Sequence, residues 1–167
     1  MSDVKLPTEI EAAAERAGFS GAEYNSVAMD ARLQSIQLLK LDLDSRPERM
    51  TGNADLSLSY GRSITSCRYD RDTHTSAAIF QYNVTAKSGR SKAFHCNAEY
   101  AVVYSTPEDA NVEAAMSFAK HVGSFAAYPY FRALAAQMAW NAGIDLPPLP
   151  TIATMPILPK PTPGDVT

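Results

Sequence analysis

The chain has 167 residues, 46% of them hydrophobic and 20% charged, which fits one globular domain. Its formal net charge of -3 disfavours nucleic-acid binding, because phosphate backbones require a basic surface. The opening stretch lacks the apolar run of a signal peptide, and no span reaches membrane length. We therefore expect a cytoplasmic protein that does not insert into membranes, with its two cysteines reduced.

Three parts are predicted along the chain. Residues 1–24 form a lead-in with a short alanine-rich segment at 9–17, which is either one or two turns of helix or mobile. Residues 25–146 form the folded domain. Residues 147–167 hold seven of the eleven prolines and predict an extended tail, because proline continues neither a helix nor a central strand.

Four segments of the domain alternate apolar and polar residues with period two, as half-buried strands do. They cover about 36–43, 54–67, 78–86 and 94–104. A one-residue phase shift at Leu38 and Leu39 predicts a bulge in the first strand. The pattern predicts an antiparallel sheet with one apolar face and one polar face, the latter including Asp55 and Glu99.

Two helices are expected in the second half of the domain. Thr106 and Pro107 favour a helix start, and an apolar stripe follows until Gly123 and Ser124 interrupt it. Pro129 predicts that a second helix begins there or is kinked, and Gly143 ends it. The fold class is therefore α+β, with a four-stranded antiparallel sheet and two helices packed on one face. From the first stripe we assign Met116, Ala119 and Val122 to core or subunit packing.

Catalytic chemistry is not predicted. Motifs for a nucleophile elbow, a dinucleotide loop or a phosphate loop do not occur, and no histidine or cysteine has metal-ligand spacing. Cys96 lies at an inward strand position, which is typical of a small core residue rather than a nucleophile. We expect no enzyme activity, no catalytic residue, no metal and no cofactor.

Apolar residues instead exceed what one small sheet can cover. Most of the aromatic side chains near the helix break are expected to be core residues. The surplus implies self-association, a groove for a partner, or both. The apolar residues near the helix break, from which this surplus comes, are Phe118, Phe125, Tyr128, Tyr130, Phe131 and Trp140, followed by Leu146 and Leu149.

The order of elements and one local string resemble the SecB family of protein-export chaperones, from about Tyr24 to Pro150. The string Tyr128-Pro129-Tyr130-Phe131-Arg132 is similar to the family's aromatic-Pro-Tyr-x-Arg motif, and residues 143–150 are similar to its proline-rich exit. The resemblance implies a bacterial, ATP-independent holdase that keeps unfolded polypeptides competent for translocation, assembled as a homotetramer, a dimer of dimers. We expect the client groove to involve Tyr128, Phe131, Met138, Trp140, Leu146 and Leu149.

Partners and use stay open at this stage. The short Asn-Phe-Asp-Ala-Leu ending of export members is missing, and Asp55 and Glu99 are only candidates for the face that docks the SecA motor. Some relatives instead shield an antitoxin in toxin–antitoxin systems. A third reading is a small-molecule-binding α+β domain, with its site between sheet and helices.

Overall fold

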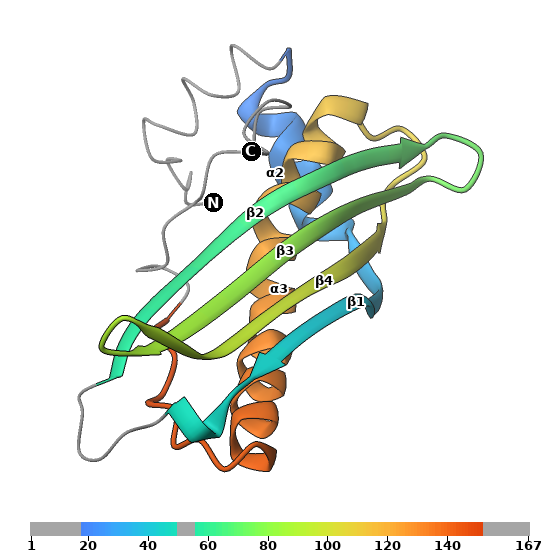
Figure 1. The fold of residues 1–167 in the computed structure, drawn as a ribbon. Helices are drawn as coiled ribbons and strands as arrows, with labels where there is room; N and C mark the ends of the chain where they lie inside the picture. The colour runs from blue at the N-terminus through green and yellow to red at the C-terminus, as the bar shows by residue number, and fades with distance from the viewer. Residues whose placement is uncertain (1–17, 50–55, 152–167) are drawn as a thin grey trace, which may run out of the picture.

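The computed structural model describes residues 18–49 and 56–151. Figure 1 shows an antiparallel sheet with helices on one side, so the predicted α+β class is confirmed. Within the described ranges the elements are α2 (Gly21–Asp30), β1 (Arg32–Ser45), the 3-10 turn η1 (Pro47–Arg49), β2 (Leu56–Asp70), β3 (Thr75–Ser88), β4 (Ser91–Ser105) and α3 (Val112–Asn141).

The sheet has the order β1-β4-β3-β2, so β1 and β2 are its outer strands. The predicted bulge is confirmed, because the β1–β4 register shifts between Leu38 and Lys40. Further register shifts lie in β1, between Leu33 and Ser35, and in β2, between Ile64 and Ser66. The β3–β4 hairpin turns at Gly89, whose φ of 59° is a left-handed conformation that glycine adopts without strain.

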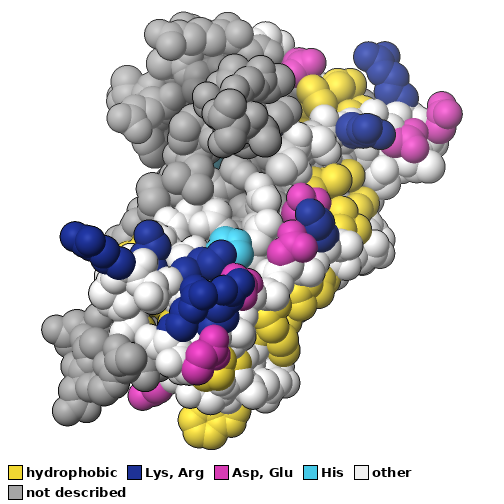
Figure 2. All heavy atoms as spheres, viewed as in Figure 1, with side chains coloured by type: hydrophobic (Ala, Val, Ile, Leu, Met, Phe, Trp, Pro, Cys, Tyr) yellow, Lys and Arg dark blue, Asp and Glu magenta, His cyan; other side chains and the backbone are white. Residues whose placement is uncertain are grey.

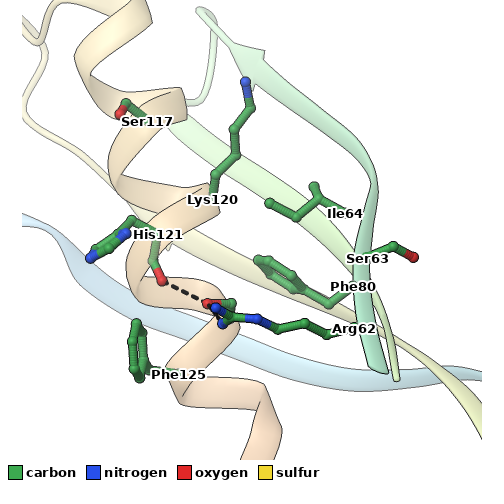
Figure 3. Close-up of a pocket in the computed structure, with 9 residues that line it drawn as sticks. Arg62, Ser63, Ile64, Phe80, Ser117, Lys120, His121 and Phe125 are labelled. Carbon is green, nitrogen blue, oxygen red and sulfur yellow. Dashed lines mark hydrogen bonds between the residues drawn. The ribbon is translucent and has the colours of Figure 1, made fainter. Parts of the chain in front are cut away.

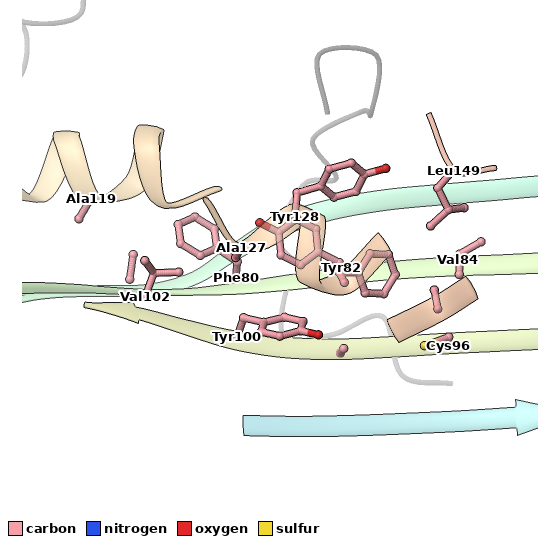
Figure 4. Close-up of a cluster of buried hydrophobic side chains, with 14 of the residues drawn as sticks. Phe80, Tyr82, Val84, Cys96, Tyr100, Val102, Ala119, Ala127, Tyr128 and Leu149 are labelled. Carbon is pink, nitrogen blue, oxygen red and sulfur yellow. The ribbon is translucent and has the colours of Figure 1, made fainter. Parts of the chain in front are cut away.

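Alternation along β3 and β4 separates the two faces of the sheet, as the sequence predicts. Inward residues from Ala78 to Ala86 and from Phe94 to Tyr104 are buried, while residues of opposite phase are half-buried on the outer face. Figure 4 shows inward side chains of β3 and β4 meeting side chains of α3. The Tyr82 and Phe131 rings stack there, with centroids 5.4 Å apart. The core therefore lies between α3 and the two central strands.

The prediction of two helices after the sheet is wrong, because α3 runs unbroken from Val112 to Asn141. Gly123 does not end it: the glycine is buried, and a Cβ there would lie 2.9 Å from the Phe80 ring. The glycine thus permits close helix–sheet packing. Pro129 is exposed, so the carbonyl that its missing N–H leaves free lies on the solvent side of the helix.

Thr106 and Pro107 precede α3 rather than start it, which corrects the predicted cap. Asn111 is the N-cap, and its side-chain oxygen accepts hydrogen bonds from the backbone N–H groups of Glu113 and Ala114 at 2.9 and 3.2 Å. The Thr106 hydroxyl donates instead to the His74 carbonyl at 3.1 Å. Thr106 therefore fixes the loop between β4 and α3.

The second helix of the fold is α2, which precedes the sheet and which the sequence pattern does not predict. Ser20 and Glu23 cap it reciprocally, and the Asn111 side chain donates to Glu23 at 3.0 Å, linking the starts of the two helices. Val27 is buried, and Tyr24 lies against Phe118 of α3 with ring centroids 6.2 Å apart. The predicted helical segment at 9–17 and most of the proline-rich tail lie outside the described residues.

Candidate functional site

The inner face of β1 is not covered by α3. Its inward leucines pair in register with buried residues of β4, yet each side chain is 37–50% exposed, and the bulged Leu39 is 51% exposed. Figure 2 shows hydrophobic side chains along the edge of the molecule where β1 lies in Figure 1. We call this set the β1 leucine edge: Leu33, Leu38, Leu39, Leu41 and Leu43.

A pocket of about 280 Å³ lies at the other outer strand, between β2 and the middle of α3. Figure 3 shows the Arg62 guanidinium reaching across from β2 to α3, with the Phe80 ring on the floor and the Ser63 side chain pointing away. We call it the β2–α3 pocket; it is lined by Arg62, Ser63, Ile64, Phe80, Ser117, Lys120, His121, Ser124 and Phe125.

Hydrogen bonds to Ser124 hold Arg62 in position. The Arg62 Nη1 donates to the Ser124 hydroxyl at 3.1 Å, and that hydroxyl donates to the His121 carbonyl at 2.9 Å. The Tyr82 hydroxyl donates to the Ser124 carbonyl at 2.7 Å. The guanidinium carbon lies 5.8 Å from the centre of the Phe125 ring, within range of a cation–π contact. A cation is therefore fixed beside apolar side chains.

Reactive groups do not gather in the described part of the chain. Burial raises the pKa of Cys96 to about 11 and also raises the pKa of Cys67, so both thiols stay protonated at neutral pH. Burial likewise raises the pKa of Tyr82. Within residues 18–49 and 56–151, no group of three or more His, Cys, Asp or Glu side chains could hold a metal ion. The chemistry available at the β2–α3 pocket is binding by a cation and apolar side chains.

The six residues expected in a client groove do not form one surface. Tyr128, Phe131 and Leu149 are buried, because they complete the core between α3 and the sheet. Trp140 is 79% exposed near the end of α3, while Met138 and Leu146 are half-buried beside the core. The Tyr128 hydroxyl donates to the Pro150 carbonyl, which holds the exit segment against the helix.

The residues assigned to packing are spread over α3. Ala119 is fully buried, whereas Met116 and Val122 are half-buried. Of the two candidates for motor docking, Glu99 is half-buried on the outer face of the sheet, opposite Lys40 and Gln81, and Asp55 lies outside the described residues. The face in Figure 2 carries Lys and Arg side chains beside Asp and Glu, not a patch of one sign.

Sequence reasoning missed Arg62 and Ile64 as site residues, although a signal was present. In the alternation of the second strand, both occupy the inward phase, since they pair with the buried Tyr82 and Phe80. A basic residue at an inward position of an apolar strand is costly unless it serves an interaction. The signal in the sequence was therefore a basic residue, Arg62, at an inward position of the alternation that includes Leu58.

No protein-family model matches this chain, and no curated protein matches it. Among solved structures, the chain is similar to a SecB-like chaperone from Mycobacterium tuberculosis in complex with a ChAD peptide from the HigA1 antitoxin. The TM-score is 0.60 at 19% sequence identity, over 84% of this chain and 99% of the other. The fold is SecB-like. No helix in the described ranges combines the length and hydrophobicity that a membrane span requires.

Proposed function

We propose that this protein is an ATP-independent, cytoplasmic SecB-like holdase that binds unfolded, aggregation-prone polypeptides without enzymatic activity. The observation that carries the proposal is exposed apolar surface on the inner faces of both outer strands, which the chain's own helix leaves uncovered. A fold shared with a chaperone that holds a peptide supports the same function. The pocket serves a small-molecule domain less well, because at about 280 Å³ it is smaller than most ligand cavities.

Weak contacts at each pocket suit such a role. One buried Leu or Phe side chain of a client contributes about 1.5–3 kcal/mol before ordering costs of about 0.5–1.5 kcal/mol per side chain. A single pocket therefore binds weakly and reversibly. Several copies in one particle raise the apparent affinity for a long client through effective concentration, without a tight individual site.

The β1 leucine edge supports self-association. An outer strand with exposed leucines presents both unpaired backbone groups and apolar surface, and pairing with a second copy would cover both. We therefore propose a homo-oligomer built first through β1, with a dimer of dimers as the final assembly.

The test is suppression of aggregation of a chemically denatured, slowly folding client at near-stoichiometric protein, without nucleotide. We expect Phe125→Ser to require several-fold more protein for the same effect, because Phe125 is 44% exposed at the pocket. Tyr130→Ser is the matched control, since Tyr130 is 56% exposed on the same helix but does not line the pocket. Unchanged aggregation at excess wild-type protein would reject the holdase.

Two uses of a holdase are compatible with this surface, and one observation favours the second. Export competence for SecA is the first; the second is protection of an antitoxin, and the similar solved chaperone carries an antitoxin peptide. Glu99 is half-buried on the outer sheet face, so it offers little acidic surface for docking. Binding of a SecA tail peptide and of an antitoxin fragment, measured side by side on the purified protein, separates the two uses.

A further inference from the structure

We propose that the β2–α3 pocket recognises an apolar side chain next to an acidic one in a bound polypeptide, with the client carboxylate held by Arg62. This inference rests on the proposed holdase function and names the sequence class that the pocket takes. A purely apolar groove would have the opposite preference, because a client charge buried there would have no partner.

The charged side chains around the β2–α3 pocket are all basic. Its lining includes Arg62, Lys120 and His121, and none of its nine residues is acidic. Among the described residues, neither Arg62 nor Lys120 forms an ion pair; the three pairs present lie at Lys40, Asp44 and their neighbours. The positive charge at the pocket is therefore not neutralised within the described chain, and a carboxylate complements it.

Arg62 has hydrogen-bond donors that the described part of the chain does not use. A guanidinium has five N–H donors, and Arg62 spends one on Ser124. Its Nε is buried and has no hydrogen-bond partner within the described residues. Guanidinium groups bind carboxylates with two parallel hydrogen bonds, and because the Nε is buried, the terminal nitrogens are the donors left for an incoming carboxylate. Because Ser124 is itself held by Tyr82, the guanidinium is pre-positioned and loses little freedom on binding.

The β2–α3 pocket also has apolar side chains beside its cation. Figure 3 places the Phe80 ring next to the Arg62 guanidinium, with Ile64 beyond that ring and Phe125 on the helix side. Ile64 is 38% exposed and Phe125 is 44% exposed, so both can contact an incoming side chain. The pocket volume of about 280 Å³ holds one large apolar side chain with a carboxylate beside it. An extended peptide along β2 presents residues i and i+2 on one face, so an apolar residue and an acidic residue two positions apart, such as Leu and X in Leu-Phe-X, enter the pocket together.

A different role for Arg62 makes a different prediction. Charges that point inward on outer strands hinder edge-to-edge pairing, and a residue kept for that purpose would not distinguish client sequences. Binding of an uncharged Arg62 variant to peptides that differ only in charge distinguishes these two roles, which an aggregation assay alone does not.

The experiment measures fluorescence anisotropy of labelled peptides with the full-length protein. The peptides have amidated C-termini and Gly/Ser flanks around Leu-Phe-X, where X is Glu, Gln or Lys, so that only the side chain at X changes charge. A fourth peptide has Gln at X and a free C-terminal carboxylate directly after it. We expect the Glu peptide to bind about fivefold to tenfold more tightly than the Gln peptide, and the Lys peptide most weakly, at low salt.

Two charge-removing variants on β2 locate the effect. Arg62→Gln should bind the Glu and Gln peptides equally, whereas Arg68→Gln should keep the preference, because Arg68 is exposed on the outer face of the same strand. Lys120→Gln, which changes an exposed side chain, should reduce the preference and provides the test if Arg62→Gln does not fold.

The outcomes distinguish this inference from the holdase function. If the Gln peptide binds and the Glu peptide binds no better, the inference is overturned while the holdase stands. A preference that survives Arg62→Gln, or a free C-terminal carboxylate that binds as tightly as the Glu side chain, also overturns it. If none of the peptides binds, the inference is overturned, whereas the holdase function is decided separately by the aggregation assay with the wild-type protein.

Discussion

The central and outer strands of the sheet have the same alternating pattern but opposite surroundings. Inward residues of β3 and β4, such as Phe80 and Val102, are 0–1% exposed under α3. Inward residues of the outer strands, such as Leu38 and Ile64, are 38–45% exposed. The difference arises because α3 packs mainly on the two central strands and covers the outer strands only in part, so each outer strand retains apolar surface.

The two outer strands also differ from each other. On β1 the uncovered residues are all leucines, which suits contact with a second copy of the same surface. On β2 they include Arg62 within an otherwise apolar stripe, which suits a partner of mixed chemistry. The comparison therefore supports the proposal that the centre of the sheet stabilises the fold, while β1 serves assembly and β2 serves client binding.

The largest effect is expected in the central region. Phe131→Ala removes a fully buried ring that stacks on Tyr82, so it should lower the free energy of unfolding by about 3–5 kcal/mol. Trp140→Ala is the control from the same helix, because a ring that is 79% exposed should change this free energy by less than about 0.5 kcal/mol. Urea denaturation followed by circular dichroism measures both. Equal losses of unfolding free energy in the two variants would contradict the assignment of Phe131 to the core and of Trp140 to the free surface.

A smaller loss is expected where α3 approaches β3 most closely. Gly123→Ala places a methyl group 2.9 Å from the Phe80 ring, which should cost about 1–3 kcal/mol despite the better helix propensity of alanine. Phe80→Leu in the same chain removes the ring and should restore part of the loss, as the double-mutant cycle would show. Additive losses in the cycle would contradict direct contact as the cause.

At the β1 leucine edge we expect a change in self-association rather than in folding. Leu38→Lys places a charge on the inner phase of β1, and it should weaken self-association at least about tenfold, or about 1.4 kcal/mol, with little change in protomer unfolding. Gln37→Lys is the matched control, because the adjacent residue points to the outer face. Sedimentation over a concentration series measures the mass. A wild-type protein that stays monomeric would remove the proposed role of this edge.

Much of the sheet was predictable, because period-two alternation depends on residues close in sequence. The bulge at Leu39 was predicted from a phase shift alone, and the burial of one face of the sheet was predicted from the alternation. The helices were less predictable. A glycine and a proline ordinarily interrupt helices, yet Gly123 is required by packing on Phe80, a residue 43 positions away on another element.

For the candidate site, only its general kind, an apolar groove, was predicted from the sequence, and not the residues that line it. Aromatic residues near Pro129 suggested a groove, but the burial of Tyr128 and Phe131 depends on which face of α3 meets the sheet, and a continuous helix sets that face differently from two short ones. The pocket itself joins Arg62 on β2 to Ser124 on α3, and such a pairing follows from topology rather than from local pattern. The strand phase of Arg62 was the usable signal.

The smallest effect is expected at the junction of the two helices, away from both outer strands. Hydrogen bonds from the Ser20 backbone N–H and hydroxyl, and then from Asn111, hold the pKa of Glu23 below its ordinary value of 4.5. The carboxylate therefore stabilises the fold fully above pH 4.5, and this contribution is lost as the pH falls through the lower folded-state pKa. Glu23→Gln should lower the melting temperature slightly at pH 7 and flatten its decline between pH 6 and 3. Glu108→Gln, an exposed loop carboxylate, should keep the wild-type slope, and identical slopes for all three proteins would show that the α2 cap does not contribute to acid sensitivity.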